Sequence, residues 1–350
     1  MVVPVGPCVH VVMAAYKPNP KYLAAQIRSI LGQSHSNLEL LIVFDGPHPE
    51  IVETVCGYAD SRIFVVTLPV RQGALRAFEF GLAEVLRRAD GDDEMFAFCD
   101  QDDVWETDKL AVQVAALRSL CGLCHSDATI IDDEGRVVAG SLFALEQRPF
   151  IADAGTLAMF NSVTGMTMVF SRKVAEAALP FPTMLPGMQH DWWVALVAAL
   201  VGQLRFLPEP LVGYRWHDAN VVGAGRGSLA RDPAVHDGLS TLRSTCLRQY
   251  LARFTLAEAA AELADRRGIS VPRIIAELAH PGWIGACRFI GRWVVAMAHG
   301  KRNLARAAAR VACGLIVALM RAGRAGVAPA DLCRDIVARV GDPTRTGPQS

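Results

Sequence analysis

The sequence has no excess charge of either sign, because its 35 lysine and arginine residues equal its 35 aspartate and glutamate residues. Proteins that bind nucleic acid usually carry a basic excess, so this balance argues against nucleic acid as a partner. The chain also has no long apolar run. The longest one near the C-terminus, 311–320, is about half of the ~20 residues that a membrane-spanning helix needs. We therefore predict no transmembrane segment.

The nine cysteines have no regular spacing, and Cys121 and Cys124 form the only C-x-x-C pair. A zinc site needs further ligands nearby, so a structural role for Cys124 in a buried strand is the simpler interpretation. The first residues show no basic segment followed by an apolar run, which predicts no secretory signal. We expect a protein with free thiols in the reducing cytoplasm.

Short apolar runs alternate with segments of helical periodicity through the first half of the chain. The runs have the length and β-branched content of strands, and they lie at 9–15, 38–44, 63–68 and 95–99. Asn19 and Pro20 suit the N-cap and first position of a helix, and helical periodicity returns over 73–88. This alternation predicts an α/β fold with a mainly parallel sheet and helices on both faces.

Three polar positions follow three of these predicted strands. Tyr16, Asp45 and Asp100 each lie where a strand ends. Ligands of open α/β sheets bind beyond the carboxyl ends of the strands, so we expect these residues to meet at one edge of the sheet.

The composition changes after about residue 230, where alanine and arginine dominate and turn residues become sparse. Helical segments are predicted over 239–267 and 283–322. Glycine, aspartate and proline residues near 225–233 mark a boundary. We predict a catalytic domain over 1–226 and a helical region over 227–350.

An acidic cluster follows the wholly apolar run 95–99. Asp100, Asp102 and Asp103 place three carboxylates within four residues. These groups repel one another unless a cation compensates, and their hard oxygens suit Mg²⁺ or Mn²⁺, which in turn hold a diphosphate. A solvated acidic turn is the alternative. Because the cluster emerges from an apparent core strand, the sequence favours the metal site.

Two histidine-bearing segments lie further along the chain. His190 and Asp191 begin an apolar helix, where Asp191 either caps the helix or acts as a general base. Spacing alone favours the cap. His217 follows an apparent strand over 211–214, and a single histidine there is more often structural than a ligand.

In this order, these segments closely resemble family 2 glycosyltransferases of the GT-A fold, in the branch often labelled rhamnosyltransferase-like. The resemblance covers about residues 8–225, and it depends on the joint order of pieces that are each weakly specific. Two segments depart from this resemblance. Many relatives have two acidic residues where this chain has Phe44 and Asp45. They have an asparagine-rich segment where this chain has residues 70–73, which include Arg71. The matching segments are 13–16, 22–23, 26–30, 44–46, 100–105, 109–110, 125–128, 161, 164–166, 190–193, 209–215, 217 and 220–223.

The resemblance also implies roles for individual residues. Asp191 corresponds to the catalytic base of inverting members. The implied metal-binding residues are Asp102, Asp103 and His217, with Asp102 and Asp103 left unranked as principal ligand. The implied nucleotide-sugar-binding residues are Ala15, Tyr16, Asp45, Arg71 and Asp100. The implied acceptor-binding residues are Thr164, Gly165, His190 and Trp192.

The resemblance thus implies a metal-dependent, inverting glycosyltransferase. It would move a sugar, rhamnose being one candidate, from a nucleotide-diphosphate donor to a hydroxyl of a cell-surface glycan or lipid-linked precursor. Two alternatives stay open. A sugar nucleotidyltransferase is disfavoured because no glycine-rich, lysine-bearing phosphate loop lies near the first strand. A non-catalytic homologue is disfavoured because Asp102 and Asp191 are intact.

The helical region has an unusual charge pattern. Between His280 and Gly326 the sequence has eight lysine or arginine residues and no aspartate or glutamate. Apolar residues such as Trp283 and Phe289 are interleaved with them. Basic amphipathic helices of this kind lie in the headgroup layer, which predicts peripheral attachment to an anionic membrane surface at its cytoplasmic face. The alternative is that these helices pack on the catalytic domain with solvated arginines.

Overall fold

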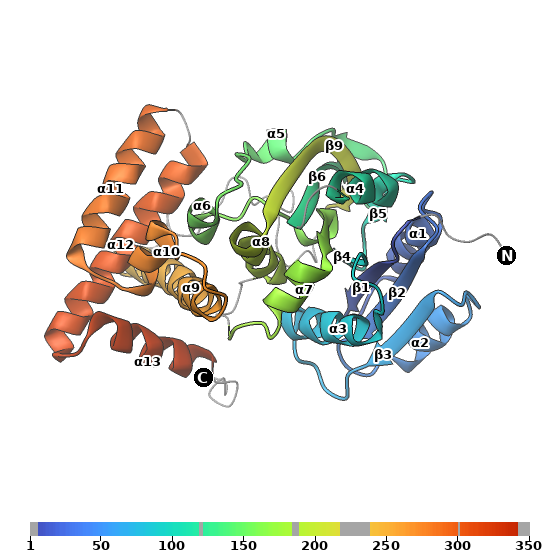
Figure 1. Cartoon of the computed structure of the whole chain (residues 1–350), viewed down its shortest axis with the longest axis horizontal. Helices are drawn as coiled ribbons and strands as arrows, with labels where there is room; N and C mark the ends of the chain where they lie inside the picture. Colours follow the sequence, from blue (N-terminus) through green and yellow to red (C-terminus); the bar gives the residue numbers. More distant parts are fainter. Residues whose placement is uncertain (1–5, 119–121, 184–188, 218–238, 300–301, 342–350) are drawn as a thin grey trace. The chain divides into compact units, whose positions relative to one another are not determined.

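The structure is a computed structural model that describes residues 6–118, 122–183, 189–217, 239–299 and 302–341 (Figure 1). The chain divides into two compact units. Unit 1 contains all the strands and most of the helices before residue 202, and unit 2 contains α6 (Ala154–Met159) and the helices after residue 238. The predicted boundary at 226/227 lies outside the described residues. Sequence analysis did not foresee that α6 would belong to unit 2.

Unit 1 is built on one mixed sheet of order β3-β2-β1-β4-β8-β6-β9-β5, with β7 paired to β6. The first four strands of this order are mutually parallel, whereas β8 is antiparallel to both of its neighbours. The predicted mixed, mainly parallel sheet flanked by helices is therefore confirmed. The strands are β1 (Val9–Ala15), β2 (Leu38–Phe44), β3 (Ile63–Thr67), β4 (Met95–Cys99), β5 (Val104–Trp105), β6 (Gly122–Ile131), β7 (Val137–Ala139), β8 (Met168–Ser171) and β9 (Gln203–Arg215).

Helices cover both faces of this sheet, as Figure 1 shows for α1 and α3. The predicted cap at Asn19 is confirmed, because its side-chain oxygen accepts the N–H of Lys21 at 2.9 Å. In α3 (Ala74–Arg88), Gly81 lies so close to β1 that a Cβ would meet Val12 at 2.4 Å. The other helices are α1 (Pro20–Leu31), α2 (Pro49–Cys56), α4 (Lys109–Leu117), α5 (Leu142–Glu146), α7 (Arg172–Ala178) and α8 (His190–Val201), with a 3₁₀ turn η1 (Gly165–Thr167).

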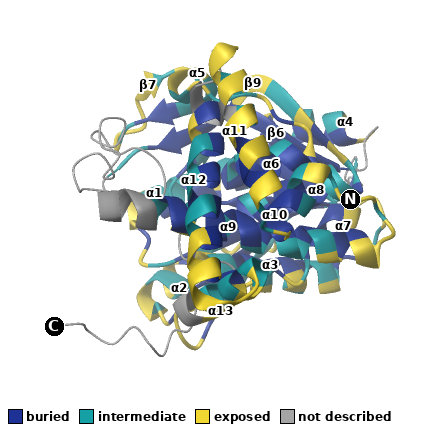
Figure 2. Ribbon diagram, turned by 90° about the vertical axis from the view of Figure 1, so that its left-hand side faces the viewer, coloured by how far each residue is buried: buried dark blue, intermediate teal, exposed yellow. Residues whose placement is uncertain are grey.

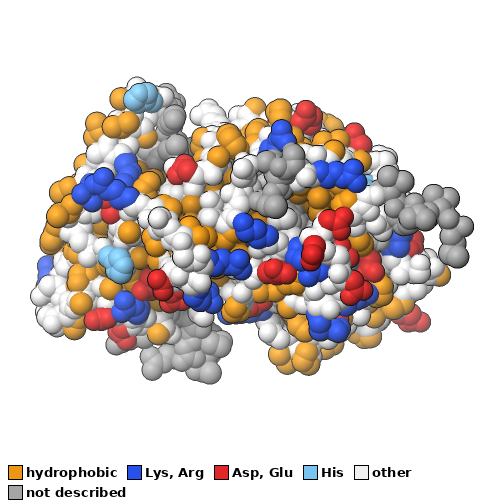
Figure 3. Space-filling view, viewed as in Figure 1, with side chains coloured by type: hydrophobic (Ala, Val, Ile, Leu, Met, Phe, Trp, Pro, Cys, Tyr) orange, Lys and Arg blue, Asp and Glu red, His pale blue; other side chains and the backbone are white. Residues whose placement is uncertain are grey.

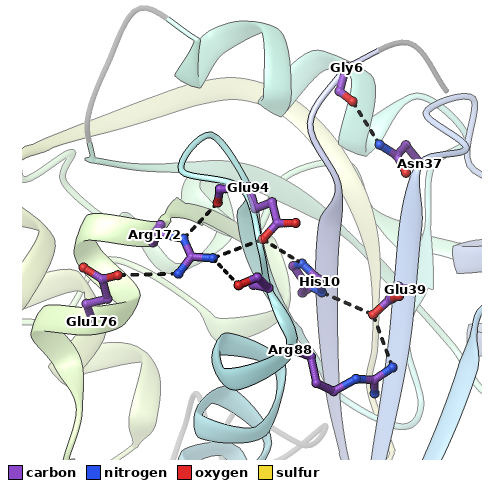
Figure 4. Close-up of polar contacts among 10 residues, drawn as sticks. Gly6, His10, Asn37, Glu39, Arg88, Glu94, Arg172 and Glu176 are labelled. Carbon is purple, nitrogen blue, oxygen red and sulfur yellow. Dashed lines mark hydrogen bonds and ion pairs between the residues drawn. The ribbon is translucent and has the colours of Figure 1, made fainter. Parts of the chain in front are cut away.

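Charged side chains join the amino-terminal ends of the parallel strands (Figure 4). The ring nitrogens of His10 lie 3.4 Å from Glu39 and 3.4 Å from Glu94, which come from β2 and from the turn before β4. Arg88 and Arg172 lie on the outer sides of these glutamates, at 3.6 and 3.3 Å. This edge of the sheet is closed by ion pairs, so it differs from the opposite, carboxyl edge that the site occupies.

The pairing of β6 with β9 requires a residue without a side chain at Gly122. A Cβ there would lie 1.9 Å from the carbonyl oxygen of Gln203, on the paired strand. Because backbone cannot swing aside as a side chain can, we expect Gly122→Ala to lower the free energy of unfolding by about 3 kcal/mol. Urea unfolding measures this loss. Gly140→Ala is the control, since nothing lies within 4 Å of a Cβ at that position; equal effects of the two substitutions would contradict the proposed clash.

Unit 2 is helical. Its core is built around α9 (Leu239–Arg266), where Tyr250 and Phe254 are buried and the Tyr250 hydroxyl donates to the carbonyl of Leu278 at 3.2 Å. The segment 283–322 was predicted to be helical throughout, but it contains two helices. The first helix ends at Ala298, shortly before Gly300 in the sequence, and glycine is a weak helix former. Beside α6 and α9, the helices are α10 (Arg273–Ala279), α11 (Trp283–Ala298), α12 (Arg302–Ala325) and α13 (Pro329–Gly341).

No single helix of the described residues is long and apolar enough to span a bilayer. Two consecutive segments, Ala305–Ala325 and Pro329–Ala338, together have the length and composition for it, but they are bent by 101°.

Candidate active site

The first part of the site lies where β1 and β2 end. The two carboxylate oxygens of Asp45 accept the backbone N–H groups of Gln72 and Gly73 at 2.6 and 2.8 Å. Asp45 therefore holds the backbone beside Arg71, whose guanidinium carbon lies 4.1 Å from the ring centroid of Tyr16. The structure brings these three predicted nucleotide-sugar residues together, with Asp45 as the anchor of the loop.

The predicted residue Ala15 lies at the end of β1. Its side chain is buried, and its carbonyl accepts the N–H of Asp45 at 2.8 Å. Next to it, the side chain of Gln101 accepts the Tyr16 N–H at 2.8 Å and so links the end of β1 to the acidic cluster. Gln101 lies within the matching segment 100–105 but was predicted to have no role of its own. The signal available in the sequence was its neutral side chain between the carboxylates of Asp100 and Asp102.

The carboxylates of Asp102 and Asp103 point toward different partners. Asp103 is fully buried, and its Oδ1 accepts the backbone N–H of Arg215 at 3.0 Å. Asp102 keeps 18% of its side chain exposed and places Oδ2 2.8 Å from His217 Nε2. The sequence left Asp102 and Asp103 unranked; their surroundings favour Asp102 as the ligand and give Asp103 the role of a backbone anchor.

Arg215 is a buried residue that the predicted site omitted. Its Nε donates to the Asp102 carbonyl at 2.8 Å and its Nη1 to the Asp132 carbonyl at 2.6 Å. Its guanidinium lies 4.6 Å from the ring centroid of Tyr22, which in turn stacks on His217. Arg215 thereby fixes the backbone of the acidic cluster. The signal available in the sequence was its place at the end of the matching segment 209–215.

Burial and mutual repulsion set the protonation of this cluster. Burial, with the charges of Asp102 and Asp191, raises the pKa of Asp100 to about 7. Burial and the neighbouring carboxylates raise the pKa of Asp103 well above its usual range. The hydrogen bond to Asp102 raises the pKa of His217. Because Asp191 acts on Asp100, the predicted base and the acidic cluster belong to one site.

The chemistry of Asp102 and His217 fits a divalent cation. Among the described residues no group of three or more His, Cys, Asp or Glu side chains forms a ready-made metal site. Mg²⁺, however, is usually held by one or two carboxylates together with substrate phosphates. Asp102 Oδ2 and His217 Nε2 share a hydrogen bond of 2.8 Å, so the two side chains already face one position, where a cation would take the place of the shared proton.

Asp191 lies in the first turn of α8, one residue beyond the first helical residue. The N-cap of this helix is Gln189, whose side chain makes no capping hydrogen bond. Asp191 Oδ2 instead accepts the N–H of Gly165 at 3.2 Å and Oδ1 that of Trp192 at 2.6 Å. The N-cap role that spacing favoured is therefore wrong, because the carboxylate is directed toward η1.

His190 occupies the core. Its ring stacks on Phe78 with centroids 3.7 Å apart and meets Phe98 edge-on at 5.0 Å. A Cβ at Gly165 would lie 2.7 Å from His190 Nε2, so Gly165 provides the space for this ring. With only 5% of its surface exposed, His190 is suited to packing, and direct acceptor contact would require it to leave these rings.

The remaining predicted acceptor residues, Thr164 and Trp192, are half-buried. Thr164 Oγ1 accepts a hydrogen bond from Arg148 Nη1 at 2.7 Å. Arg148 is in turn paired with Glu146 at 2.7 Å. Arg148 was not predicted, since no local pattern connects position 148 with 164. The motif residues 220–223 lie outside the described residues.

Two buried histidines make the fold sensitive to acid. Burial lowers the pKa of His125 and of His190 to about 3. The unfolded chain therefore binds more protons between pH ~6.5 and 3, and stability falls as the pH falls through this window. Each histidine contributes about 1.4 kcal/mol per pH unit.

We expect His125→Leu to remove one of these contributions. Between pH ~6.5 and 5 the variant should lose about 2 kcal/mol less stability than the wild type. Urea unfolding at several pH values measures both curves, and groups common to both proteins cancel in the difference. Parallel curves would show that His125 takes up protons equally in the folded and unfolded states.

The family model described as glycosyl transferase family 2 matches residues 10–153. An uncharacterised glycosyltransferase of Haemophilus influenzae is 30% identical over 181 residues, which are 51% of this chain and 67% of that protein. The chain belongs to glycosyl transferase family 2. This membership agrees with the GT-A fold implied by the sequence, since both the family and the mixed sheet with its acidic cluster after β4 are now established.

Two further relatives extend the comparison. An uncharacterised glycosyltransferase of Nostoc sp. is 29% identical over 57% of this chain and 62% of its own length. The Escherichia coli UDP-Glc:alpha-D-GlcNAc-diphosphoundecaprenol beta-1,3-glucosyltransferase WfgD is 31% identical over 31% of this chain and 40% of its own length. The chain thus spans about three fifths or less of the length of these two glycosyltransferases.

Proposed function

We propose that this family 2 protein is an inverting glycosyltransferase that moves a sugar from a nucleotide-diphosphate donor to an acceptor hydroxyl. One arrangement carries the proposal. The antiparallel pairing of β4 with β8 places η1, which directly precedes β8, beside the end of β4 where the acidic cluster begins, and the N–H of Gly165 in η1 holds Asp191 at 3.2 Å, so a candidate base and a candidate diphosphate site lie at the same edge of the sheet. Tyr16, which follows β1, stacks with Arg71 of the loop between β3 and α3, and the pair offers a platform for the nucleotide.

The reaction follows from this arrangement. Asp191 takes the proton of the acceptor hydroxyl as its oxygen attacks the anomeric carbon. The bond from that carbon to the nucleoside diphosphate breaks on the opposite face, so the configuration inverts. The N–H of Gly165 holds the Asp191 carboxylate in place.

Asp102 and His217 would hold Mg²⁺ or Mn²⁺ jointly with the diphosphate. When bound, the ion supplies electrostatic stabilisation of the charge on the leaving group. Asp103 supports this pair indirectly, because it fixes the N–H of Arg215, two residues before His217.

The proposal also includes a class of donor and a class of acceptor. WfgD is named for a UDP-glucose donor and a lipid diphosphate acceptor, and we extend the general class, a nucleotide sugar and a glycan or lipid-linked acceptor of the cell surface, to this chain. Rhamnose remains a candidate sugar through the rhamnosyltransferase-like segments. Such an acceptor would place the protein at the cytoplasmic face of a membrane, as a peripheral protein.

A screen of nucleotide sugars tests the proposal. A bound donor should raise the melting temperature in the presence of Mn²⁺, because ligands stabilise the state that binds them. The donor found in this way should then yield free nucleoside diphosphate with an acceptor present. Release of pyrophosphate would identify a nucleotidyltransferase instead. Donor binding without product, across a panel of lipid-linked and soluble glycans, would identify a non-catalytic homologue.

A further inference from the structure

An exposed apolar face runs along the whole of α11. Figure 2 shows exposed residues along this helix. The helix has 16 residues, which corresponds to a length of about 24 Å. At 100° per residue, its exposed apolar side chains fall within one arc of less than half the circumference. We call this arc the α11 face; it is defined by Trp283, Ile284, Cys287, Ile290, Val294 and Met297, all of which are exposed.

The other side of α11 accounts for its packing within unit 2. Ala286 and Phe289 are buried there, and α12 is the neighbouring helix. The α11 face takes no part in this packing, since Trp283, Ile284 and Val294 are 58%, 70% and 54% exposed. Exposed apolar surface that is continuous over a whole helix marks an interaction site more often than scattered exposed residues do.

Positive charge lies along one edge of the α11 face. Arg288 and Arg292 follow the face around the helix, and both pair with Glu277 of α10, at 2.6 and 2.9 Å. Arg273 pairs with the same carboxylate at 3.1 Å. Three arginines thus share one acidic group, and two positive charges remain uncompensated within this cluster. Figure 3 shows basic and hydrophobic side chains together on this side of α11.

The combination of an apolar face with a positively charged edge favours one kind of partner. The sequence from His280 to Gly326 has no acidic residue, so the surroundings of the α11 face are basic as well as apolar. A second copy docked on the same face would bring a like-charged edge against this one, which disfavours self-association. An anionic lipid surface offers both an apolar layer and acidic headgroups.

We propose that α11 is a membrane-contacting helix that lies in the plane of an anionic bilayer surface, with the α11 face in the acyl boundary and Arg288 and Arg292 at the headgroups. Within unit 2, α12 packs on α9 and α11, whereas the residues of the α11 face stay exposed. This inference gives a structural basis to the peripheral location in the proposed function, and it does not depend on the chemistry of the site.

Cys287 provides a probe in the middle of the α11 face. In a Cys56→Ser background, the exposed thiol among the described residues is that of Cys287, which can carry an environment-sensitive fluorophore. We expect a blue shift with vesicles of phosphatidylcholine and phosphatidylglycerol, a much smaller shift with pure phosphatidylcholine, and loss of the shift at high salt. Absence of a shift with the anionic vesicles at low salt would overturn the proposal.

Substitutions distinguish binding through the α11 face from nonspecific adsorption of the protein to vesicles. In vesicle sedimentation with the thiols unlabelled, Ile290→Asp should weaken binding about tenfold or more, because a charge replaces an apolar group that enters the acyl boundary. Val137→Asp is the matched control, since Val137 is also exposed but belongs to β7, and it should leave binding unchanged. Equal effects of the two substitutions would contradict a specific role for α11.

The same thiol detects the competing partner. If two copies pair through the α11 face, mild oxidation without lipid should give a Cys287–Cys287 dimer whose yield rises with protein concentration. That result without vesicle binding would assign the α11 face to a protein interface. Donor turnover with a soluble acceptor, measured without vesicles, tests the proposed enzymatic function separately. Failure of the membrane proposal can therefore be told apart from failure of the proposed function.

Discussion

The Asp191→Asn variant is expected to lose most of its sugar-transfer rate, about 10²–10⁴-fold, and to keep its affinity for the donor. Asparagine has nearly the same shape and can still accept the N–H of Gly165, which the structure places 3.2 Å from Asp191 Oδ2. The amide cannot take up the acceptor proton. Single-turnover kinetics and donor titration by calorimetry measure the two quantities independently.

A true helix cap is the appropriate control for this variant. Asp153 caps α6, since its side chain accepts the N–H of Thr156 at 2.8 Å. Asp153→Asn should retain the rate, and Asp153→Ala should lower the free energy of unfolding by about 1 kcal/mol. If Asp191→Asn instead loses donor affinity with an unchanged rate from the bound state, Asp191 has a structural role and the proposed base is wrong.

The Asp102→Ala variant should have almost no turnover while its stability stays close to that of the wild type. Its side chain is partly exposed and pairs with His217, so its removal leaves no buried group without a partner. Loss of the ligand pair removes several kcal/mol of stabilisation from the leaving group, more than about 10²-fold in rate. Turnover and thermal unfolding, measured with and without Mn²⁺, check both expectations.

Asp103→Ala provides the contrast, because Asp103 is fully buried and binds the N–H of Arg215. Its removal leaves that N–H unpaired, at a cost of about 1–3 kcal/mol in unfolding free energy, and should weaken the response of stability to Mn²⁺ less than Asp102→Ala does. Full activity of the wild type in excess EDTA would contradict the assignment of Asp102 and His217 to a metal.

Local signals in the sequence were sufficient for the parallel part of the sheet of unit 1. Apolar runs predicted β1, β2, β3 and β4, and Asn19-Pro20 predicted the start of α1, whereas the antiparallel strand β8 was not predicted. Because the carboxyl ends of parallel strands must meet at one edge, Tyr16, Asp45 and Asp100 were expected to converge, and β1, β2 and β4 are indeed adjacent and parallel. Family membership was likewise readable from the order of short motifs.

The directions of the side chains, in contrast, were decided by contacts between distant parts of the chain. Asp102 and Asp103 are adjacent in sequence, yet one faces His217 and the other the backbone of Arg215, more than a hundred residues away. Spacing could not separate a cap from a candidate base at Asp191, because the distinction depends on Gly165. It could not show that His190 would be stacked against Phe78. Local patterns specify elements, since these depend on near neighbours; the burial and pairing that give each carboxylate and histidine its chemistry arise only when β4, β9, η1 and α8 pack together.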